Sequence, residues 1–354
     1  AAATGAVAAP ATADALPAAE RIIAEEMQRQ RIPGLAVAIV QDGQVLLARG
    51  YGQSNVELKV PVTTSTMFQS GSVGKQFTAA LVMTLVEEGR VGLDDPLTKY
   101  FTDAPAAWRG ITVRHLLTHT SGLPDFPYDT PAFDMRQDRT EDELVHIAYG
   151  LKPEAEPGAH WEYSNAGYLL LGALVRRVTG HFYGELLAER IFVPVGMHTA
   201  RIISESDIVP NRAAGYHLVE GHLRNQDWVA PSLNTTADGS LYVSLDDMLA
   251  WEKALRAGAL LSPASWRQVY TPVALRGGGT YPYGFGWTVR AGNGHRCIAH
   301  SGSWQGFKTA IARFDDDALA IIVLANLGDA DPSLIATRLA QAQGRDCGPD
   351  GDAD

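Results

Sequence analysis

Ser72 and Lys75 are the residues of this 354-residue chain whose types and spacing most directly suggest chemistry. A separation of three places them side by side on one face of a helix. The segment that follows, residues 77–86, is almost entirely apolar, so the helix is expected to be buried, where an unpaired lysine is costly. Because a serine hydroxyl needs an adjacent base to act at neutral pH, we interpret Ser72 as a nucleophile and Lys75 as a group that helps to remove its proton.

A lysine amine can accept a proton only where burial or a nearby positive charge lowers its pKa. The first turn of a buried helix supplies both a partial positive charge and apolar surroundings. The alternative is a serine that caps the helix beside a lysine whose stem covers apolar surface. Of the six lysines, only Lys75 has a serine three residues before it, which favours the catalytic interpretation.

Strand patterns lie at both ends of the chain and helical patterns lie between them. Asp42-Gly43 separates two apolar runs and predicts a β-hairpin that is covered on both faces. We therefore expect an α/β fold of the mixed α+β type, in which an antiparallel sheet from the N- and C-terminal segments is flanked by helices and interrupted by an all-α insertion. The expected strands are residues 34–40, 44–48, 56–60, 296–300, 307–314 and 318–325, and the expected helices are residues 16–29, 112–117, 168–179, 245–257 and 332–343.

These elements divide the chain into two expected domains. Residues 16–92 and 215–345 would form a discontinuous α/β domain, and residues 93–214 a mainly helical insertion domain. Residues 1–15 and 346–354 would be flexible termini. Asp331-Pro332 opens the last helix, because aspartate caps helices and proline is tolerated at their first position.

Composition narrows the classes of function. Apolar residues make up 46% of the chain and charged residues 19%, which is typical of a globular protein. A formal net charge of −11 and a pI near 5.4 argue against a general nucleic-acid role. No apolar run is long enough to span a bilayer. The alanine-rich start resembles what a cleaved signal peptide leaves behind, although a trimmed chain would begin the same way, so we expect a periplasmic or secreted protein.

The chain contains two cysteines, Cys297 and Cys347. They are either two separate buried thiols or a disulfide that joins a late strand to the C-terminal tail. The expected topology makes the disulfide possible, because a final helix antiparallel to the last strand returns the chain towards the start of the strand 296–300.

Two further motifs in the chain are of the kinds that accompany a serine and a lysine spaced like Ser72 and Lys75. Tyr163-Ser164-Asn165 contains the only Tyr-x-Asn of the chain, and His300-Ser301-Gly302 would close a strand. Penicillin-binding proteins and serine β-lactamases combine S-x-x-K with motifs of these kinds. The chain resembles this family of hydrolases, and in particular the branch that contains class C β-lactamases, D-alanyl-D-alanine carboxypeptidases, D-aminopeptidases and esterases. The resemblance covers residues 22–342 and is carried by S-V-G-K-Q-F (72–77), H-L-L-T-H-T-S-G-L-P (115–124), P-G-A-H-W-E-Y-S-N-A-G-Y (157–168), Y-G-F-G-W (283–287) and H-S-G-S-W-Q-G-F (300–307).

The resemblance implies a β-lactamase/transpeptidase-like fold with the site where the α/β and helical parts meet. It also implies roles: Ser72 becomes acylated, Lys75 and Tyr163 shuttle protons, and Asn165 binds the substrate amide and steadies Lys75. The backbone N–H groups of Ser72 and Ser303 would form the oxyanion hole. His300, Ser301 and Gly302 would line the strand edge against which an extended substrate adds.

One departure from the family pattern concerns His300, which stands where K-T-G has a lysine. A lysine would bind a substrate carboxylate as a permanent cation, whereas the charge of a histidine depends on pH. This H-x-G form resembles carboxypeptidases and D-aminopeptidases more than efficient class C β-lactamases. No motif matches the glutamate-based deacylation apparatus of class A enzymes. Phe126 is expected to form an aromatic wall of the cleft.

Other conspicuous side chains are interpreted as structural. His115 and His119 have the i, i+4 spacing of metal ligands but no third ligand nearby, and no metal or cofactor is expected. Trp161 and Trp304 are interpreted as packing residues. Asp315-Asp316-Asp317 reads as a solvated turn, because it lacks the spaced ligands of a calcium loop.

The sequence thus predicts a serine hydrolase that cleaves an amide or ester of a small molecule or peptide through an acyl-enzyme. A D-alanyl-D-alanine carboxypeptidase or D-amino-acid peptidase is the first hypothesis for its activity. The alternatives are a class C-like β-lactamase, a carboxylesterase, or a β-lactam receptor that is acylated without turnover. The sequence does not indicate an oligomeric state.

Overall fold

The computed structural model describes residues 15–128, 133–202, 206–292 and 294–348. Residues 1–14 and 349–354, which the sequence assigns to flexible termini, lie outside these ranges. None of the helices in the described part of the chain is long and apolar enough to cross a membrane.

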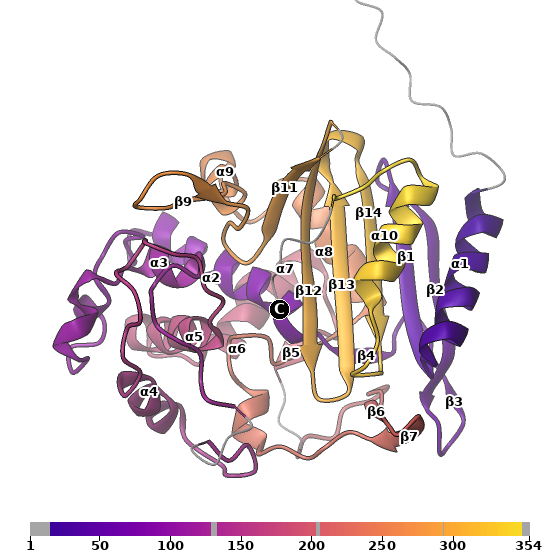
Figure 1. The fold of residues 1–354 in the computed structure, drawn as a ribbon, viewed down its shortest axis with the longest axis horizontal. Helices are drawn as coiled ribbons and strands as arrows, with labels where there is room; N and C mark the ends of the chain where they lie inside the picture. Colours follow the sequence, from indigo (N-terminus) through magenta and orange to yellow (C-terminus); the bar gives the residue numbers. More distant parts are fainter. Residues whose placement is uncertain (1–14, 129–132, 203–205, 293, 349–354) are drawn as a thin grey trace, which may run out of the picture.

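A seven-stranded antiparallel sheet in the order β11-β12-β13-β14-β1-β2-β3 forms the centre of the α/β part (Figure 1). The N-terminal and C-terminal strands meet where β1 pairs with β14, from Leu35 opposite Ala325 to Gln41 opposite Leu319. This confirms the expected mixed fold, with one sheet built from both ends of the chain. The strands are β1 (Gly34–Gln41), β2 (Gln44–Asn55), β3 (Val60–Pro61), β11 (Thr288–Gly292), β12 (His295–Trp304), β13 (Phe307–Phe314) and β14 (Leu319–Ala325).

Alternate residues of the central strands enter two separate cores, because successive side chains of a strand point to opposite faces. On β1, Leu35, Val37 and Ile39 join the core under helices α1 (Ala15–Gln30) and α10 (Pro332–Ala342). Ala36 and Ala38 face the larger core, which contains α8 (Leu245–Arg256) and α2 (Lys75–Glu87). Burial on both faces explains why these strands are apolar throughout.

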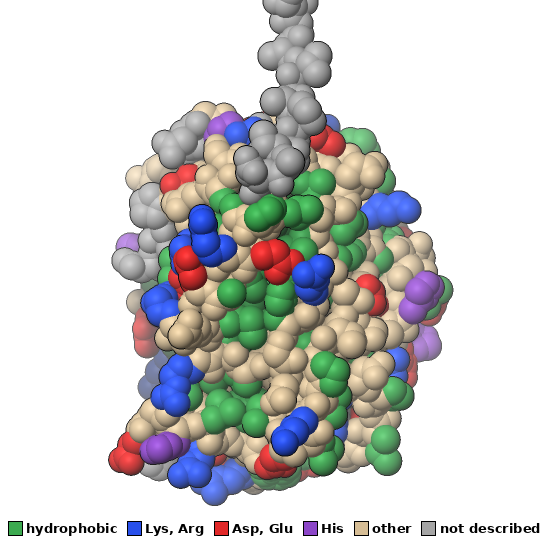
Figure 2. All heavy atoms as spheres, turned by 90° about the vertical axis from the view of Figure 1, so that its right-hand side faces the viewer, with side chains coloured by type: hydrophobic (Ala, Val, Ile, Leu, Met, Phe, Trp, Pro, Cys, Tyr) green, Lys and Arg blue, Asp and Glu red, His purple; other side chains and the backbone are tan. Residues whose placement is uncertain are grey.

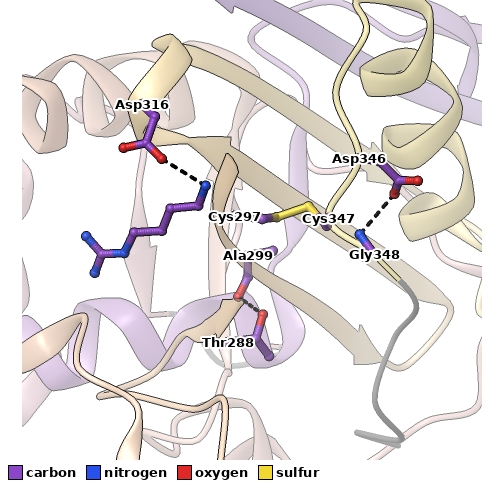
Figure 3. Close-up of a disulfide and its surroundings, with 8 residues drawn as sticks. Thr288, Cys297, Ala299, Asp316, Asp346, Cys347 and Gly348 are labelled. Atoms are coloured by element: carbon purple, nitrogen blue, oxygen red, sulfur yellow. Dashed lines mark hydrogen bonds between the residues drawn. A yellow bond between two sulfur atoms is a disulfide. The ribbon is translucent and has the colours of Figure 1, made fainter. Parts of the chain in front are cut away.

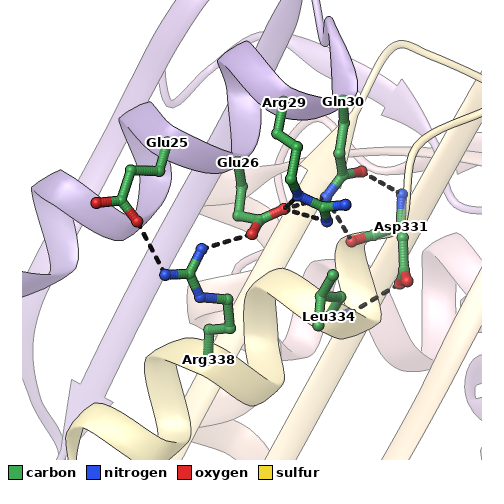
Figure 4. A network of polar contacts seen from close by, with 7 residues as sticks. All are labelled: Glu25, Glu26, Arg29, Gln30, Asp331, Leu334 and Arg338. Carbon is green, nitrogen blue, oxygen red and sulfur yellow. Dashed lines mark hydrogen bonds and ion pairs between the residues drawn. The ribbon is translucent and has the colours of Figure 1, made fainter.

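A polar network joins α1 to α10 across the outer face (Figure 4). Glu26 accepts hydrogen bonds from Arg29, Gln30 and Arg338 at 2.5–3.0 Å, and Arg338 also bonds Glu25. Burial raises the pKa of Glu26, but these donors outweigh it and lower that pKa to about 2. Figure 2 views this side of the molecule and shows acidic and basic side chains interspersed among apolar ones. The two terminal helices are thus held together by charge as well as by their shared core.

The helical part lies beside the sheet and shares the larger core with α2, to the left in Figure 1. Its longest helix, α5, begins at Asn165, and Ser164 caps it by accepting a hydrogen bond from Gly167 N–H. The bounds of this part are α3 (Val113–Leu117), α4 (Glu141–Tyr149), α5 (Asn165–Thr179), α6 (Tyr183–Leu187), a π-helical turn (Ala188–Phe192) and α7 (Val193–Val195).

Short strands and one more helix complete the described structure. β4 (Met67–Gln69), β8 (Leu241–Ser244) and β5 (Arg201–Ile202) form a small sheet in the order β4-β8-β5, directly before α2 and α8. The remaining elements are the hairpins β6 (Tyr216–Val219) with β7 (His222–Asn225) and β9 (Val273–Ala274) with β10 (Thr280–Tyr281), and helix α9 (Pro263–Val269).

Two expectations about elements were wrong. Residues 56–60 were expected to form a strand, but residues 56–59 form a turn that is closed by a hydrogen bond from Lys59 N–H to Val56 O, with Lys59 at φ +55°. Only Val60 and Pro61 pair with β2. β12 was expected to end near His300, but it continues to Trp304 and turns directly into β13. The strand that carries the H-x-G motif is therefore paired along the whole motif on its β13 side.

Cys297 on β12 and Cys347 after α10 form a disulfide (Figure 3), with Cα atoms 5.2 Å apart. This confirms the second of the two alternatives left open by the sequence. The bond joins the C-terminal segment to the strand that also contributes to the candidate site.

Candidate active site

Ser72 lies in a 3-10 turn (Gly71–Gly74) that runs directly into α2, and Lys75 is the first residue of α2. Lys75 is completely buried. Its Nζ lies 3.1 Å from Ser72 Oγ, 2.7 Å from Asn165 Oδ1 and 2.5 Å from the main-chain oxygen of Asp238. The three oxygens match the three N–H groups of an ammonium. They equally suit a neutral amine that donates to Asn165 and Asp238 and accepts the Ser72 proton.

Burial lowers the pKa of Lys75 to about 8, against the opposing charges of Asp238 and Asp125. A substantial share of Lys75 is therefore neutral near pH 8, and the neutral form has a lone pair beside the Ser72 hydroxyl. This arrangement meets the requirement for an activated serine.

Asn165 is held by Asp125, a residue that the sequence interpretation missed. Asp125 Oδ2 accepts from Asn165 Nδ2 at 2.7 Å, and Oδ1 accepts from the main-chain N–H groups of Phe126 and Ala166 at 2.9 Å. Because the amide nitrogen of Asn165 is committed to Asp125, its oxygen must face Lys75. Burial raises the pKa of Asp125, and the N–H donors oppose that rise. Its position directly after the Ser121-Gly122-Leu123-Pro124 turn could have marked Asp125 as a candidate, but no nearby sequence pattern indicates that it contacts Asn165.

Tyr163 also lies close to Lys75, whose Nζ is 4.8 Å from the centre of its ring. Its hydroxyl is buried next to the Ser72 hydroxyl. Burial raises the pKa of Tyr163, and the neighbouring Ser72 hydroxyl opposes that rise. The phenol is thus kept neutral beside the Ser72 hydroxyl.

The backbone N–H groups of Ser72 and Ser303 belong to two segments that approach each other closely. Ser72 N–H is in the first turn of a helix and has no intrahelical acceptor. On β12, Trp304 and Phe307 close a two-residue hairpin through Gln305 and Gly306, so Trp304 bonds to β13 and the N–H of Ser303 turns to the other side. Within the described structure that side of β12 has no strand partner beyond Ala299. The two N–H groups thus have the arrangement of an oxyanion hole.

Glycines make this approach possible. Gly71 has φ +52°, and a Cβ on it would collide with Ser303 N. A Cβ on Gly302 would come within 2.9 Å of Ser72 N. The strand and the helix start can therefore approach closely enough for both N–H groups to serve one small atom.

His300 does not have the environment expected of a carboxylate-binding cation. It is buried, its Nδ1 lies 2.6 Å from the Ser301 main-chain oxygen, and its Nε2 lies 2.9 Å from the Tyr283 hydroxyl. Burial lowers the pKa of His300 to about 4. Nδ1 must therefore carry the single proton, and Nε2 accepts from Tyr283.

The same chain of hydrogen bonds includes His119. Ser164 N–H donates to His119 Nδ1 at 3.2 Å, so the proton of this buried neutral ring is on Nε2, which lies 3.2 Å from the Tyr283 hydroxyl. His119 thus donates to Tyr283 and Tyr283 donates to His300. The ring of His119 also packs on Tyr163, with centres 4.3 Å apart. Both ring nitrogens of His300 are therefore already used, so the ring offers no free N–H group and no positive charge to a substrate carboxylate.

A cleft of about 1010 Å³ opens beside Ser72 and is lined by Asn165, Asp238, Ser303 and Trp304, among others. Phe126 was expected to form its aromatic wall, but Phe126 is not among the described residues that line the cleft. Tyr128 and Phe133 line the cleft instead, and their ring centres lie 5.2 Å from each other and 5.6 Å from that of Phe126.

Trp304, which was expected only to pack, also lines the cleft, and its Nε1 donates a hydrogen bond to Asn234. Trp161 stacks on Tyr281, 4.0 Å between centres.

Among the described residues no group of three or more histidines, cysteines or acidic side chains is placed to hold a metal ion. His115 and His119 do not share a helix face, because α3 ends at Leu117 and His119 has φ +56°. His115 Nδ1 instead accepts from Thr112 N–H at the start of α3.

The fold and the site are those of serine hydrolases of the β-lactamase and penicillin-binding-protein class. A family model described as Beta-lactamase matches residues 19–345, and the chain belongs to this family. It is 30% identical to "Penicillin-binding protein 4*" of Bacillus subtilis (strain 168) over 308 residues, 82% of this chain and 67% of that protein. It is 30% identical to a "D-aminopeptidase" of Gluconobacter oxydans (strain 621H) over 323 residues, 88% of this chain and 59% of that protein.

Among solved structures, the D-amino acid amidase of Ochrobactrum anthropi SV3 superimposes with a TM-score of 0.80 at 26% identity. The match covers 94% of this chain and 99% of that one. The matches cover about three fifths to two thirds of the length of the two relatives named above.

Proposed function

We propose that the protein is a hydrolase that cleaves an amide or ester through an acyl-enzyme on Ser72. The observation that carries this proposal is the completely buried Lys75, held 3.1 Å from Ser72 Oγ with a pKa lowered to about 8. A structural lysine gains nothing from such a position, whereas a general base requires it.

In the proposed acylation step, neutral Lys75 accepts the Ser72 proton as Oγ attacks the substrate carbonyl. The negative charge that develops on the carbonyl oxygen is stabilised by the N–H groups of Ser72 and Ser303. The proton then passes through the Tyr163 hydroxyl to the leaving group, which departs as an amine or alcohol. Water reverses the same sequence on the ester of Ser72 and releases the acid.

For the substrate we favour an amide of a D-amino acid over a D-alanyl-D-alanine peptide with a free carboxylate. His300 is buried and neutral, so the H-x-G strand offers no cation to such a carboxylate. The similarity to a D-aminopeptidase and to a D-amino acid amidase supports the same choice. A β-lactamase or esterase activity remains the alternative within the same mechanism.

A parallel hydrolysis panel tests this proposal: a D-aminoacyl amide, a D-alanyl-D-alanine peptide, a short-chain nitrophenyl ester and a chromogenic cephalosporin, each with wild type and Ser72→Ala. The amide is expected to be the best substrate, and Ser72→Ala to be inactive on all four. A Ser72→Ala variant with wild-type rates would refute the mechanism. The similarity to a penicillin-binding protein leaves a receptor as the other class, which a penicillin adduct that persists without turnover would reveal.

We also propose that the protein acts in the periplasm or outside the cell. The Cys297–Cys347 disulfide supports this location, because such bonds persist in oxidising compartments. Thiol titration of protein taken from the cell fraction that contains it, denatured without reductant, should find no free thiol. Two free thiols would contradict the proposal.

A further inference from the structure

Asp238 is a buried acidic residue of the cleft that the proposed mechanism does not use. Asp238 is 8% exposed, and its Oδ1 atom is buried without a hydrogen-bond partner among the described residues. A buried carboxylate oxygen normally has donors, because leaving it without them costs free energy. Asp238 nevertheless lines the cleft. A residue that lines the cleft therefore holds a buried acceptor oxygen without a donor in the described part of the chain.

The backbone places Asp238 next to the reacting atoms. The main-chain oxygen of Asp238 accepts from Lys75 Nζ at 2.5 Å. The next residue, Gly239, packs so closely on the start of α2 that a Cβ there would lie 2.9 Å from Ser72 N. A substrate group that binds at Asp238 would therefore lie near the carbonyl that Ser72 attacks.

The charges around the cleft also favour a cation. Of the described residues that line it, Asp134, Asp227 and Asp238 are acidic, and Arg136 is the one lysine or arginine. Arg136 is exposed, whereas Asp238 is buried at the centre beside the serine. Lined by excess negative charge, the cleft attracts positively charged substrates.

We propose that Asp238 binds the α-ammonium group of an amino acid whose own carbonyl is attacked by Ser72. This specificity-determining contact would select amides and esters of amino acids with a free amino group over their N-acylated forms. The proposal rests on the proposed function and names the substrate class of the same site.

Substrate binding is then coupled to activation of the base. The negative charge of Asp238 raises the pKa of Lys75 against the effect of burial. An ammonium bound to Asp238 offsets that charge, which favours the neutral, proton-accepting form of Lys75. A free-amine substrate would therefore help to prepare the site for its own acylation, and an acylated one would not.

The first test compares kcat/KM for D-alanine p-nitroanilide and its N-acetyl derivative in wild type, Asp238→Asn and Asp246→Asn. Asp246 is exposed at the start of α8 and provides the same change of charge away from the cleft. Asp238→Asn is expected to lower kcat/KM for the free amine about 10- to 150-fold, the usual effect of losing a hydrogen bond to a charged group. It should change the acetylated substrate less than about threefold, and Asp246→Asn should leave the ratio unchanged. Equal losses on both substrates, or an unchanged ratio, would overturn the proposal.

A binding experiment separates this proposal from the proposed function and from any folding defect of the variant. Ser72→Ala protein is titrated calorimetrically with D-alaninamide and with N-acetyl-D-alaninamide. Tighter binding of the free amine, about tenfold or more, supports the ammonium site even if wild type hydrolyses neither nitroanilide, in which case only the proposed function fails. Equal or weaker binding of the free amine refutes the ammonium site whatever the hydrolysis shows.

Discussion

The carboxylate of Asp125 can be replaced by an amide of almost the same shape, which changes its hydrogen bonding without removing atoms. In Asp125→Asn the amide oxygen would stay with its two main-chain donors, Phe126 N–H and Ala166 N–H, so the fold should be retained. The new NH₂ group would then face the NH₂ group of Asn165, where Asp125 Oδ2 now accepts at 2.7 Å. Two donors cannot bond each other, and Asn165 must lose this anchor or reverse its amide.

A reversed Asn165 would present NH₂ to Lys75 Nζ, in place of the oxygen that now lies 2.7 Å away. Either outcome removes a hydrogen bond to a charged group, which typically contributes about 1.5–3 kcal/mol. If the whole effect falls on the reaction, kcat/KM drops about 10- to 150-fold. The neutral form of Lys75 would also be favoured, because both the Asp125 charge and the Asn165 oxygen stabilise its ammonium form.

The assay is the pH dependence of kcat/KM on a neutral ester, with the melting temperature measured as a check on folding. We expect a lower maximum and an acidic limb displaced to lower pH than in wild type. Asp142→Asn is the matched control, since Asp142 is exposed in the first turn of α4 and loses the same charge. A folded Asp125→Asn protein with the wild-type maximum and an unmoved limb would refute the inference that Asp125 positions Lys75 through Asn165.

Three further predictions concern proton binding and the disulfide. In wild type, kcat/KM on a neutral ester should rise with pH through an apparent pKa of about 8 as Lys75 loses its proton, and a pH profile without that limb would exclude Lys75 as the base. The neutral state of His300 should cost stability in acid. The pKa of His300 falls from 6.5 to about 4 on folding, so protonation of this residue does not destabilise the folded protein above pH 6.5. As the pH falls from 6.5 through 4, about 3 kcal/mol of the free energy of unfolding is lost. Urea unfolding at pH 7 and pH 4 should therefore show a smaller acid loss in His300→Gln than in wild type, and equal losses would contradict the neutral assignment. Cys347→Ser should lower the free energy of unfolding by about 4 kcal/mol for a closed loop of about 50 residues, and an unchanged urea midpoint would contradict this.

The features that the sequence predicted well are those that depend on local spacing. Ser72 and Lys75 are three residues apart, so their proximity follows from the helix that contains them. The hairpin at Asp42-Gly43 forms because both residues take positive φ, 52° and 78°, as a tight two-residue turn requires. The sheet that joins both ends of the chain was inferred from strand patterns at the two ends with helical patterns between them.

The features that it missed depend on contacts between distant segments. Asp125 binds Asn165, which is 40 residues later in the sequence. His300 is neutral because it is buried, and its Nε2 accepts a hydrogen bond from Tyr283. Phe126 was assigned to the cleft from its position in a loop, yet Tyr128 and Phe133 line the cleft instead. Side-chain direction within an aromatic loop is set by packing, which no local pattern in the sequence records.

The account depends most directly on a covalent bond between Ser72 and the acyl part of the substrate. Wild-type protein should be mixed with a D-alanyl ester, quenched in acid during turnover, digested and examined by mass spectrometry. The account predicts that the peptide containing Ser72 gains the mass of the acyl group, that fragmentation places it on Ser72, and that Ser72→Ala shows no adduct. An acyl group on another residue, or Ser72→Ala hydrolysis at the wild-type rate, would contradict it.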